Sequence, residues 1–92
     1  MQIDFTKIAV PMDIAKTNFQ VVDIREEFAN VIYMRGSGVG CHALALKIYN
    51  SKGEEDYNDK EIGIIKQFAQ ICTPCVMDAI NDVIEKQKEA KA

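Results

Sequence analysis

The sequence predicts a mostly helical α+β chain, in which a short N-terminal β-hairpin packs with about four helices and the last two helices form an αα-hairpin. Two observations carry this prediction. β-Branched and aromatic residues gather before residue 23, and apolar residues recur at helical spacing after it. Apolar residues make up 48% of the chain and charged residues 27%, values typical of a folded protein.

The length of 92 residues suits one domain with a modest core. We therefore expect a single domain over 1–92, with the hairpin in 1–22, the helices in 23–88 and a frayed tail in 89–92. No run approaches the roughly 18 apolar residues of a membrane span, and the first residues do not build an apolar signal segment. A soluble protein without a signal peptide is expected.

Two short strands are expected before residue 23. Ile3 and Phe5 alternate with polar neighbours, and the segment 18–22 is β-branched and aromatic. Pro11 lies between them and lacks the amide hydrogen that a central strand position needs. The first strand should therefore end before Pro11, and the connection over 11–17 is longer than a tight turn.

The first helix is expected from about Ile24 to Arg35. Asp23 and Glu26 have the spacing of a capping box at its start, and Gly36 stands where a left-handed C-cap would end it. Its apolar residues fall on one face of a 3.6-residue period: Ile24, Phe28, Val31 and Ile32.

The segment Cys41 to Tyr49 fits two structures. Its apolar residues share one helical face, but Leu44, Leu46 and Ile48 also alternate as in a strand. The helix is preferred because alanine and leucine are strong helix formers. Residues 50–53 are predicted to end this helix, and the acidic run 54–56 is predicted to be a solvated loop.

A capping box of Asn58 and Glu61 opens the third helix, and Tyr57 can pack on Ile62 as a hydrophobic staple. Gly63 costs this helix about 1 kcal/mol relative to alanine. Its apolar face is wide and is expected at the centre of the core: Ile62, Ile64, Ile65, Phe68, Ala69, Ile71 and Cys72.

The fourth helix should begin directly after the third. Thr73 is its expected cap and Pro74 its first residue, where the missing amide hydrogen costs nothing. Because proline disfavours helical angles in the preceding residue, the third helix must end near Cys72. The buried face of the fourth helix is expected to consist of Val76, Ile80, Val83 and Ile84.

The motif Cys72-Thr73-Pro74-Cys75 has the form of a thioredoxin-like redox site, and Cys75 would lie in the first turn of a helix, where the helix dipole favours a thiolate. Such sites follow a strand in a βαβ unit. Here the segment 62–71 is amphipathic at helical spacing, and too little chain follows for the rest of that fold. We expect a buried Cys72 that acts as a small hydrophobe.

A zinc site is another reading of these cysteines, with Cys41 and the single histidine, His42, joining Cys72 and Cys75 as ligands. The spacing is poor, because neighbouring helix residues point about 100° apart and Cys41 and His42 would not reach one ion together. A lone CxxC is half of a structural zinc pattern. We expect no metal, no cofactor and no catalytic residue.

A helix-turn-helix reading of the last two helices would place the fourth helix in the DNA major groove. That helix would present Asp78, Asp82 and Glu85 to the phosphates, and the formal net charge of -3 also argues against a nucleic-acid partner. The glycine-rich segment 36–40 lacks the Gly-Lys-Ser/Thr of a phosphate loop and is expected to connect two helices.

Four short sequence features follow one another between residues 43 and 85. They are Ala45-Leu46-Lys47-Ile48-Tyr49-Asn50, an acidic turn, Asp59-Lys60-Glu61 opening a helix with Ile64-Ile65, and Thr73-Pro74 leading a last apolar helix. With these features the run from Ala43 through Glu85 resembles small uncharacterised proteins encoded among the structural genes of tailed phages and prophages. The resemblance implies a protein that acts by association, transfers no catalytic residues and does not require the cysteines.

The sequence as a whole predicts a non-enzymatic protein that self-associates or docks on a larger assembly, with neither membrane nor nucleic acid as partner. Its three cysteines, an odd number at low density, favour the reducing cytoplasm. Wide apolar faces on the last two helices leave area that a partner could cover. A thiol-redox or zinc protein centred on Cys72 and Cys75 is the first alternative, and a DNA-binding regulator is the second.

Overall fold

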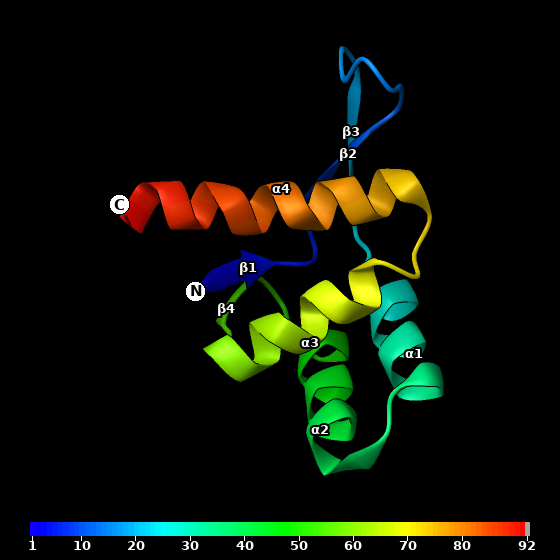
Figure 1. Cartoon of the computed structure of the whole chain (residues 1–92), viewed down its shortest axis with the longest axis vertical. Coiled ribbons are helices and arrows are strands. Elements are labelled where there is room, and N and C mark those ends of the chain that lie inside the picture. Colours follow the sequence, from blue (N-terminus) through cyan, green and yellow to red (C-terminus); the bar gives the residue numbers. More distant parts are fainter. Residues whose placement is uncertain (92) are drawn as a thin grey trace.

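The computed structural model describes residues 1–91, and the side chains of residues 1–86 (Figure 1). The elements are, in chain order, β1 (Gln2–Asp4), β2 (Ile8–Pro11), β3 (Phe19–Val22), α1 (Arg25–Arg35), α2 (Gly38–Tyr49), β4 (Glu54–Asp56), α3 (Asp59–Ala69) and α4 (Pro74–Lys91). The predicted fold class is confirmed, because four helices make up most of the described chain and an N-terminal hairpin accompanies them.

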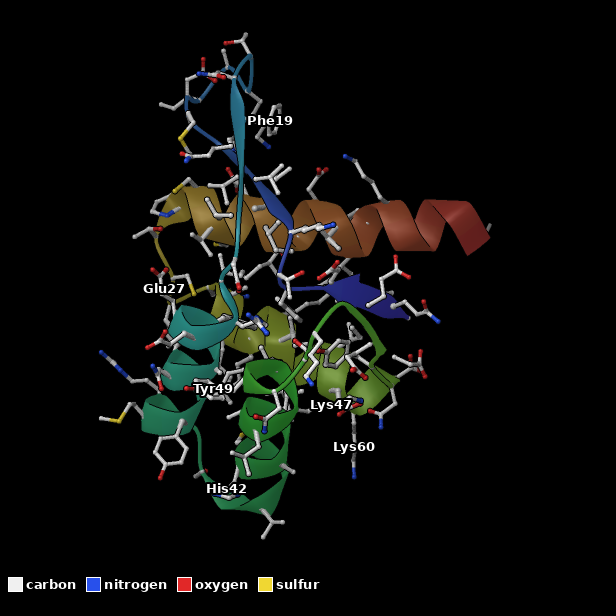
Figure 2. All side chains as sticks on the ribbon, turned by 180° about the vertical axis from the view of Figure 1, so that it is seen from behind. Phe19, Glu27, His42, Lys47, Tyr49 and Lys60 are labelled. Atoms are coloured by element: carbon white, nitrogen blue, oxygen red, sulfur yellow. The ribbon has the colours of Figure 1, made fainter. Side chains whose placement is uncertain are left out.

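The hairpin pairs β2 with β3 and stands out from the helices as a ribbon that crosses α4 (Figures 1 and 2). The prediction had the wrong first strand, because β3 pairs with Ile8–Pro11 and not with the segment around Ile3 and Phe5. Pro11 belongs to the hairpin, opposite Phe19. Proline is tolerated at this position because Pro11 and Phe19 form a pair that exchanges no main-chain hydrogen bonds.

β1 forms a second two-stranded sheet with β4, in which Ile3 lies opposite Glu55. The acidic run 54–56 is therefore a strand and not the predicted loop. All three of its side chains are exposed, so this edge strand lacks the polar–apolar alternation that identifies a strand in sequence. Its position is fixed by main-chain contacts, among them the Tyr57 amide donating to the Met1 carbonyl at 2.8 Å.

The predicted caps of α1 are wrong at both ends. Ile24 is the N-cap residue and offers no side-chain cap, while the Asp23 carboxylate accepts from the Arg25 amide at 3.0 Å and forms an ion pair with the Arg25 guanidinium. The arginine satisfies the carboxylate that the capping box would have used. At the other end Gly36 is extended, with φ -81° and ψ 166°, and its amide closes the helix by donating to the Ile32 carbonyl.

The segment 41–49 lies within helix α2, so the preference for a helix is confirmed. Leu44, Ala45 and Ile48 are buried as its apolar face requires, whereas Tyr49 is exposed. α1 and α2 pack side by side as a helical pair joined by a short connection (Figure 1).

The capping box of α3 is confirmed in both directions. The Glu61 amide donates to the Asn58 side chain at 2.8 Å, and the Asn58 amide donates to the Glu61 carboxylate at 2.9 Å. α3 ends at Ala69, earlier than the expected Cys72, and a turn over 70–73 leads into α4. Because of this turn Ile71 points outward and is 53% exposed, which corrects its predicted place in the core.

α4 begins at Pro74 as predicted, and the Thr73 carbonyl accepts from the Met77 amide in its first turn. Ile80 and Ile84 are buried, with Val76 and Val83 partly buried beside them. The helix packs on α3, completing the predicted αα-hairpin, and on β2 and β1. It continues to Lys91, past the expected boundary at residue 88, and residue 92 lies outside the described residues.

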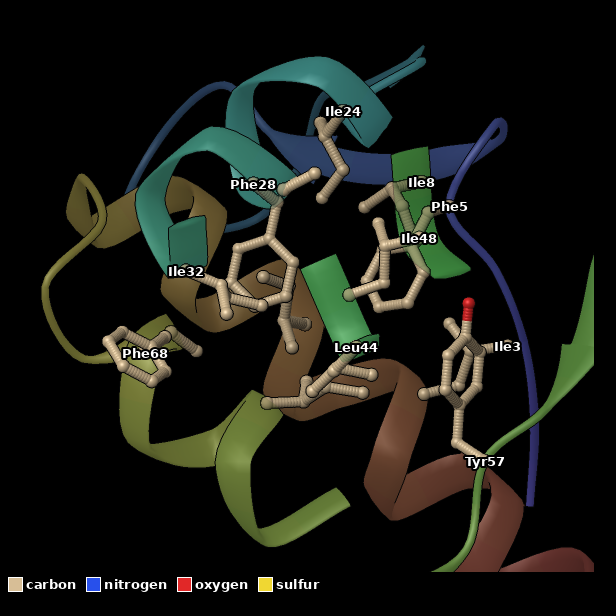
Figure 3. Packing of buried hydrophobic residues seen from close by; sticks show 14 of the residues in the cluster. Ile3, Phe5, Ile8, Ile24, Phe28, Ile32, Leu44, Ile48, Tyr57 and Phe68 are labelled. Carbon is tan, nitrogen blue, oxygen red and sulfur yellow. The ribbon is translucent and has the colours of Figure 1, made fainter. Parts of the chain in front are cut away.

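Three aromatic rings lie at the centre of the core (Figure 3). Phe5 stacks on Phe28 with 5.5 Å between the ring centroids, and it lies nearly perpendicular to the Tyr57 ring with 5.6 Å between the centroids. Phe5 comes from the loop between β1 and β2, Phe28 from α1 and Tyr57 from the residues just before α3. The core thus joins the start of the chain to helices that follow much later in the sequence.

The hydroxyl of Tyr57 has no hydrogen-bond partner in the described part of the chain, although the residue is fully buried. Burial raises the pKa of Tyr57 above its usual range and the charges of Glu55 and Glu61 add to this, while the nearby Ser51 hydroxyl, which donates to the Ile48 carbonyl, lowers it. The Lys47 ammonium lies 4.6 Å from the ring centroid, on the ring face and not at the hydroxyl. Among the side chains that the structure describes, the Tyr57 hydroxyl is thus a buried polar group without a partner, which destabilises the core.

Replacing Tyr57 with phenylalanine is expected to raise the free energy of unfolding by about 1 kcal/mol at neutral pH, because the buried hydroxyl is removed and the ring is kept. In the wild type the pKa of Tyr57 is higher in the folded state than in the unfolded state. The stability that this difference contributes is fully present below about pH 10 and is lost as the pH rises through the folded-state pKa. Tyr57→Phe should lose less stability between pH 8 and 11, measured by urea denaturation. Tyr33→Phe, at a 58% exposed position, is the control and should behave like the wild type.

Candidate interaction surface

The two cysteines of the predicted motif lie in the turn and first residues that join α3 to α4, but in different surroundings. Cys72 is partly buried, and its thiol donates to the Phe68 carbonyl at 3.6 Å. Burial, with a smaller contribution from Glu27, raises the pKa of the Cys72 thiol. Cys75 is exposed, and its sulfur lies 3.6 Å from the Thr73 hydroxyl. A raised pKa disfavours the thiolate that redox chemistry at Cys72 would need.

Cys41 and His42 lie elsewhere, in the first turns of α2. The backbone of Gly36 lies close against Cys41, and the His42 ring lies beside Tyr33 with 5.9 Å between the ring centroids. Figure 2 shows His42 at the end of α2 that is far from the turn between α3 and α4. Among the described side chains, those of residues 1–86, no three histidine, cysteine or acidic residues form a group that could hold a metal ion. The four residues of the zinc hypothesis are not brought together.

A shallow groove of about 410 Å³ runs between α1 and α2. Ala29 and Ala45 line its floor, and the side chains of Leu46 and Tyr49 are about half exposed on its rim. Its full lining is Glu26, Ala29, Asn30, Tyr33, His42, Ala45, Leu46 and Tyr49. The groove gives apolar contact area with a few polar groups, which suits binding better than bond-making chemistry.

The hairpin carries four of the large hydrophobic side chains that are exposed among the described residues: Met12, Ile14, Phe19 and Val21. Residues 12–21 are all exposed, and among them Ile14 is fully open to solvent at 101% and Val21 is 63% exposed. By contrast Ile8 and Val10, at the base of the ribbon, are buried where β2 packs on α4. One face of the ribbon is therefore anchored in the core and the rest is open.

The register shows which side chains share the open face. Val21 lies opposite Ala9, and Phe19 lies opposite Pro11. Because side chains alternate along a strand, Ala9, Phe19 and Val21 are on the face opposite to Ile8 and Val10 and point away from α4, whereas Pro11 at the end of β2 is buried. We call Ala9, Phe19 and Val21 the outer hairpin face. Phe19 is 49% exposed on it.

The outer edge of β3 offers free main-chain groups. The Met12 amide donates to the Asn18 carbonyl at 2.8 Å, so 12 and 18 are a hydrogen-bonded pair. Such pairs alternate along an antiparallel ladder, which makes 11/19 and 9/21 non-bonded pairs. Phe19 and Val21 therefore turn their N–H and C=O groups away from β2. No hydrogen bond from the described backbone, or from the side chains of residues 1–86, is seen to reach these groups.

The loop at the tip of the hairpin is held by one aspartate. The Asp13 carboxylate accepts from the Thr17 amide at 2.9 Å and from the Thr17 hydroxyl, and these hydrogen bonds lower the pKa of Asp13. Lys16 takes a left-handed conformation with φ 58°, and its amide donates to the Asp13 carbonyl. The strands therefore leave the loop in a defined register.

The outer hairpin face does not follow from the predicted hairpin, in which the partner strand of residues 18–22 is wrong. Had Ile8 and Val10 been recognised as the buried alternation of a strand, Phe19 and Val21 would have followed as exposed residues on the opposite face. The alternation of Ile8 and Val10 is present in the sequence but spans only a few residues, and the following Pro11 argues against a strand there.

Neither a family model, nor a curated protein, nor a solved structure matches this chain. The case for a function therefore rests on the surfaces described above. Separately, none of the helices within the described residues is both long and apolar enough to cross a membrane.

Proposed function

We propose that this is a small, non-enzymatic interaction protein that binds other protein chains through the outer hairpin face. One observation carries the proposal: Phe19 and Val21 are 49% and 63% exposed on a ribbon that stands off the helical body. Exposed apolar residues that gather on one face mark interaction sites, and an uncovered strand edge beside them adds main-chain hydrogen bonds.

The association takes the form of self-assembly or of docking on a larger assembly, such as those encoded by tailed-phage and prophage structural genes. It needs no cofactor, and its partners are neither nucleic acid nor membrane, in keeping with the net charge of -3. The cytoplasm is its compartment, which the three free thiols at Cys41, Cys72 and Cys75 support.

A photo-reactive phenylalanine analogue at position 19 tests the proposal. Incorporated in the cells that make the protein, it is expected to give one discrete adduct on irradiation, because a partner covers the outer hairpin face. Mass spectrometry of the purified adduct reads the identity of the cross-linked chain.

The matched control places the same analogue at Val39, which is 85% exposed at the start of α2 and does not belong to the hairpin. This position should give no discrete adduct. The proposal fails if position 19 gives none, or if both positions give the same distribution of products.

A further inference from the structure

We infer that the partner is a second copy of this chain, joined by antiparallel pairing of β3 with β3 of the copy. Phe19 then lies opposite Val21 of the second copy, and Val21 opposite its Phe19. The inference rests on the proposed function, because it assigns the occupant of the same surface.

The two edges of the hairpin are unlike, and this selects β3. The outer edge of β2 is formed by Ala9 and Pro11, and the proline offers no N–H there. Proline and charged side chains are the usual means by which proteins protect a strand edge. β3, with the sequence Phe19-Gln20-Val21-Val22, has neither. One edge of the ribbon is blocked, and the other is open.

The open edge is complementary to itself. Only Phe19 and Val21 of β3 turn their main-chain groups outward, so an added strand must bond to these two residues. Suppose that the added strand is β3 of a second copy and that Gln20 lies opposite Gln20. The outward N–H and C=O groups of Phe19 in each chain then bond to the outward groups of Val21 in the other. The result is a twofold arrangement in which both chains use the same residues.

The same register also matches the side chains. Phe19 and Val21 of each copy meet on the outer hairpin face, an aromatic residue against a β-branched one, which is a favourable cross-strand pair. Gln20 meets Gln20 of the second copy, amide to amide. Asp23 falls opposite Thr17 of the second copy, so no like charges face each other although each chain has a net charge of -3. Two marginal two-stranded ribbons become one four-stranded sheet.

A cysteine at position 20 tests the register. Gln20 lies opposite itself in a non-hydrogen-bonded pair, where the Cα atoms are about 4.5 Å apart, within the range of a disulfide. Mild oxidation of Gln20→Cys should link two chains. Trypsin, cutting after Lys16 and Arg25, releases a peptide 17–25 without any native cysteine. The expected product is two copies of this peptide joined by a disulfide.

Asn18→Cys is the matched control, because it is also exposed and lies in the same tryptic peptide. In the inferred register residue 18 lies opposite Val22 of the second copy, so the two introduced cysteines are about 13 Å apart along the strands. No linked 17–25 peptide is expected. Equal linkage at positions 18 and 20 would overturn the register.

Val21→Pro tests the strand edge itself. It removes an outward N–H but no hydrogen bond of the hairpin, because 9/21 is a non-bonded pair. Native mass spectrometry and sedimentation should show a dimer dissociation constant at least about tenfold higher than in the wild type. Val21→Thr keeps the N–H and should keep the dimer. Circular dichroism spectra and melting temperatures establish that both variants fold.

Different experimental results would overturn the second-copy inference and the proposed function. A wild-type protein that stays monomeric up to millimolar concentration overturns the second-copy inference. So does a dimer that is insensitive to Val21→Pro and forms no disulfide through position 20. If the photo-adduct at position 19 joins a different protein, the proposed function stands and the second-copy inference falls.

Discussion

Replacing Phe5 with alanine is expected to remove a large part of the folding free energy of this protein. Phe5 is fully buried and contacts both other rings of the aromatic cluster, Phe28 at 5.5 Å and Tyr57 at 5.6 Å. Truncating a buried phenylalanine costs about 3 to 5 kcal/mol. A chain of this length has about 5 to 14 kcal/mol in total. The midpoint of urea denaturation should therefore fall by about a fifth or more.

The size of this effect comes from the position of Phe5, which holds together segments that no secondary structure connects. Its loop links β1 to β2, and the Phe5 carbonyl accepts from the Ile24 amide at 3.0 Å just before α1. In Phe5→Ala the neighbouring rings would face a cavity, and α1 would lose the ring contact that Phe28 makes with the loop between β1 and β2.

Phe5→Leu is the matched control, since it keeps the position apolar and fills most of the volume. It should cost about 1 to 2 kcal/mol. The melting temperature gives a second readout, at about 4 to 8 °C for each kcal/mol in a domain of this size. If Phe5→Ala and Phe5→Leu have the same denaturation midpoint, the aromatic cluster is not the centre of the core.

The helical part of the fold could be predicted from sequence because its signals are local. Asn58 and Glu61 lie three residues apart, and their reciprocal hydrogen bonds need nothing from the rest of the chain. Pro74 likewise marks the start of α4 by its own chemistry. The prediction failed at the start of α1, where a second local interaction competed for the same side chain: Arg25, only two residues along the chain, took the carboxylate of Asp23.

The sheets could be predicted only in part because strand pairing is non-local. β1 pairs with β4 across fifty residues, and the exposed acidic side chains of β4 give no periodic signal. The interaction surface depends on the same information. Phe19 and Val21 were seen as strand residues, but their exposure follows from the pairing with Ala9 and Pro11. The cysteine motif, visible in sequence, proved to be two thiols in different surroundings.

Gly36→Ala is expected to lower the free energy of unfolding by about 1 to 3 kcal/mol, through overpacking. The conformation of Gly36, φ -81° and ψ 166°, is open to any residue, so backbone strain is not the cause. Space is the cause, since an added Cβ would lie 2.6 Å from the Ile32 carbonyl oxygen and 2.8 Å from the Cβ of Cys41. Both neighbours belong to helices that must separate to admit a methyl group.

Gly63→Ala makes the same chemical change inside α3, and the opposite sign is expected. An added Cβ there meets nothing within 4 Å, so only the helix propensity changes, and the free energy of unfolding should rise by about 0.5 to 1 kcal/mol. Urea denaturation of both variants beside the wild type separates the two effects. A neutral Gly36→Ala would mean that α1 and α2 are not in close contact at their connection, and the shape of the groove between them would have to be reconsidered.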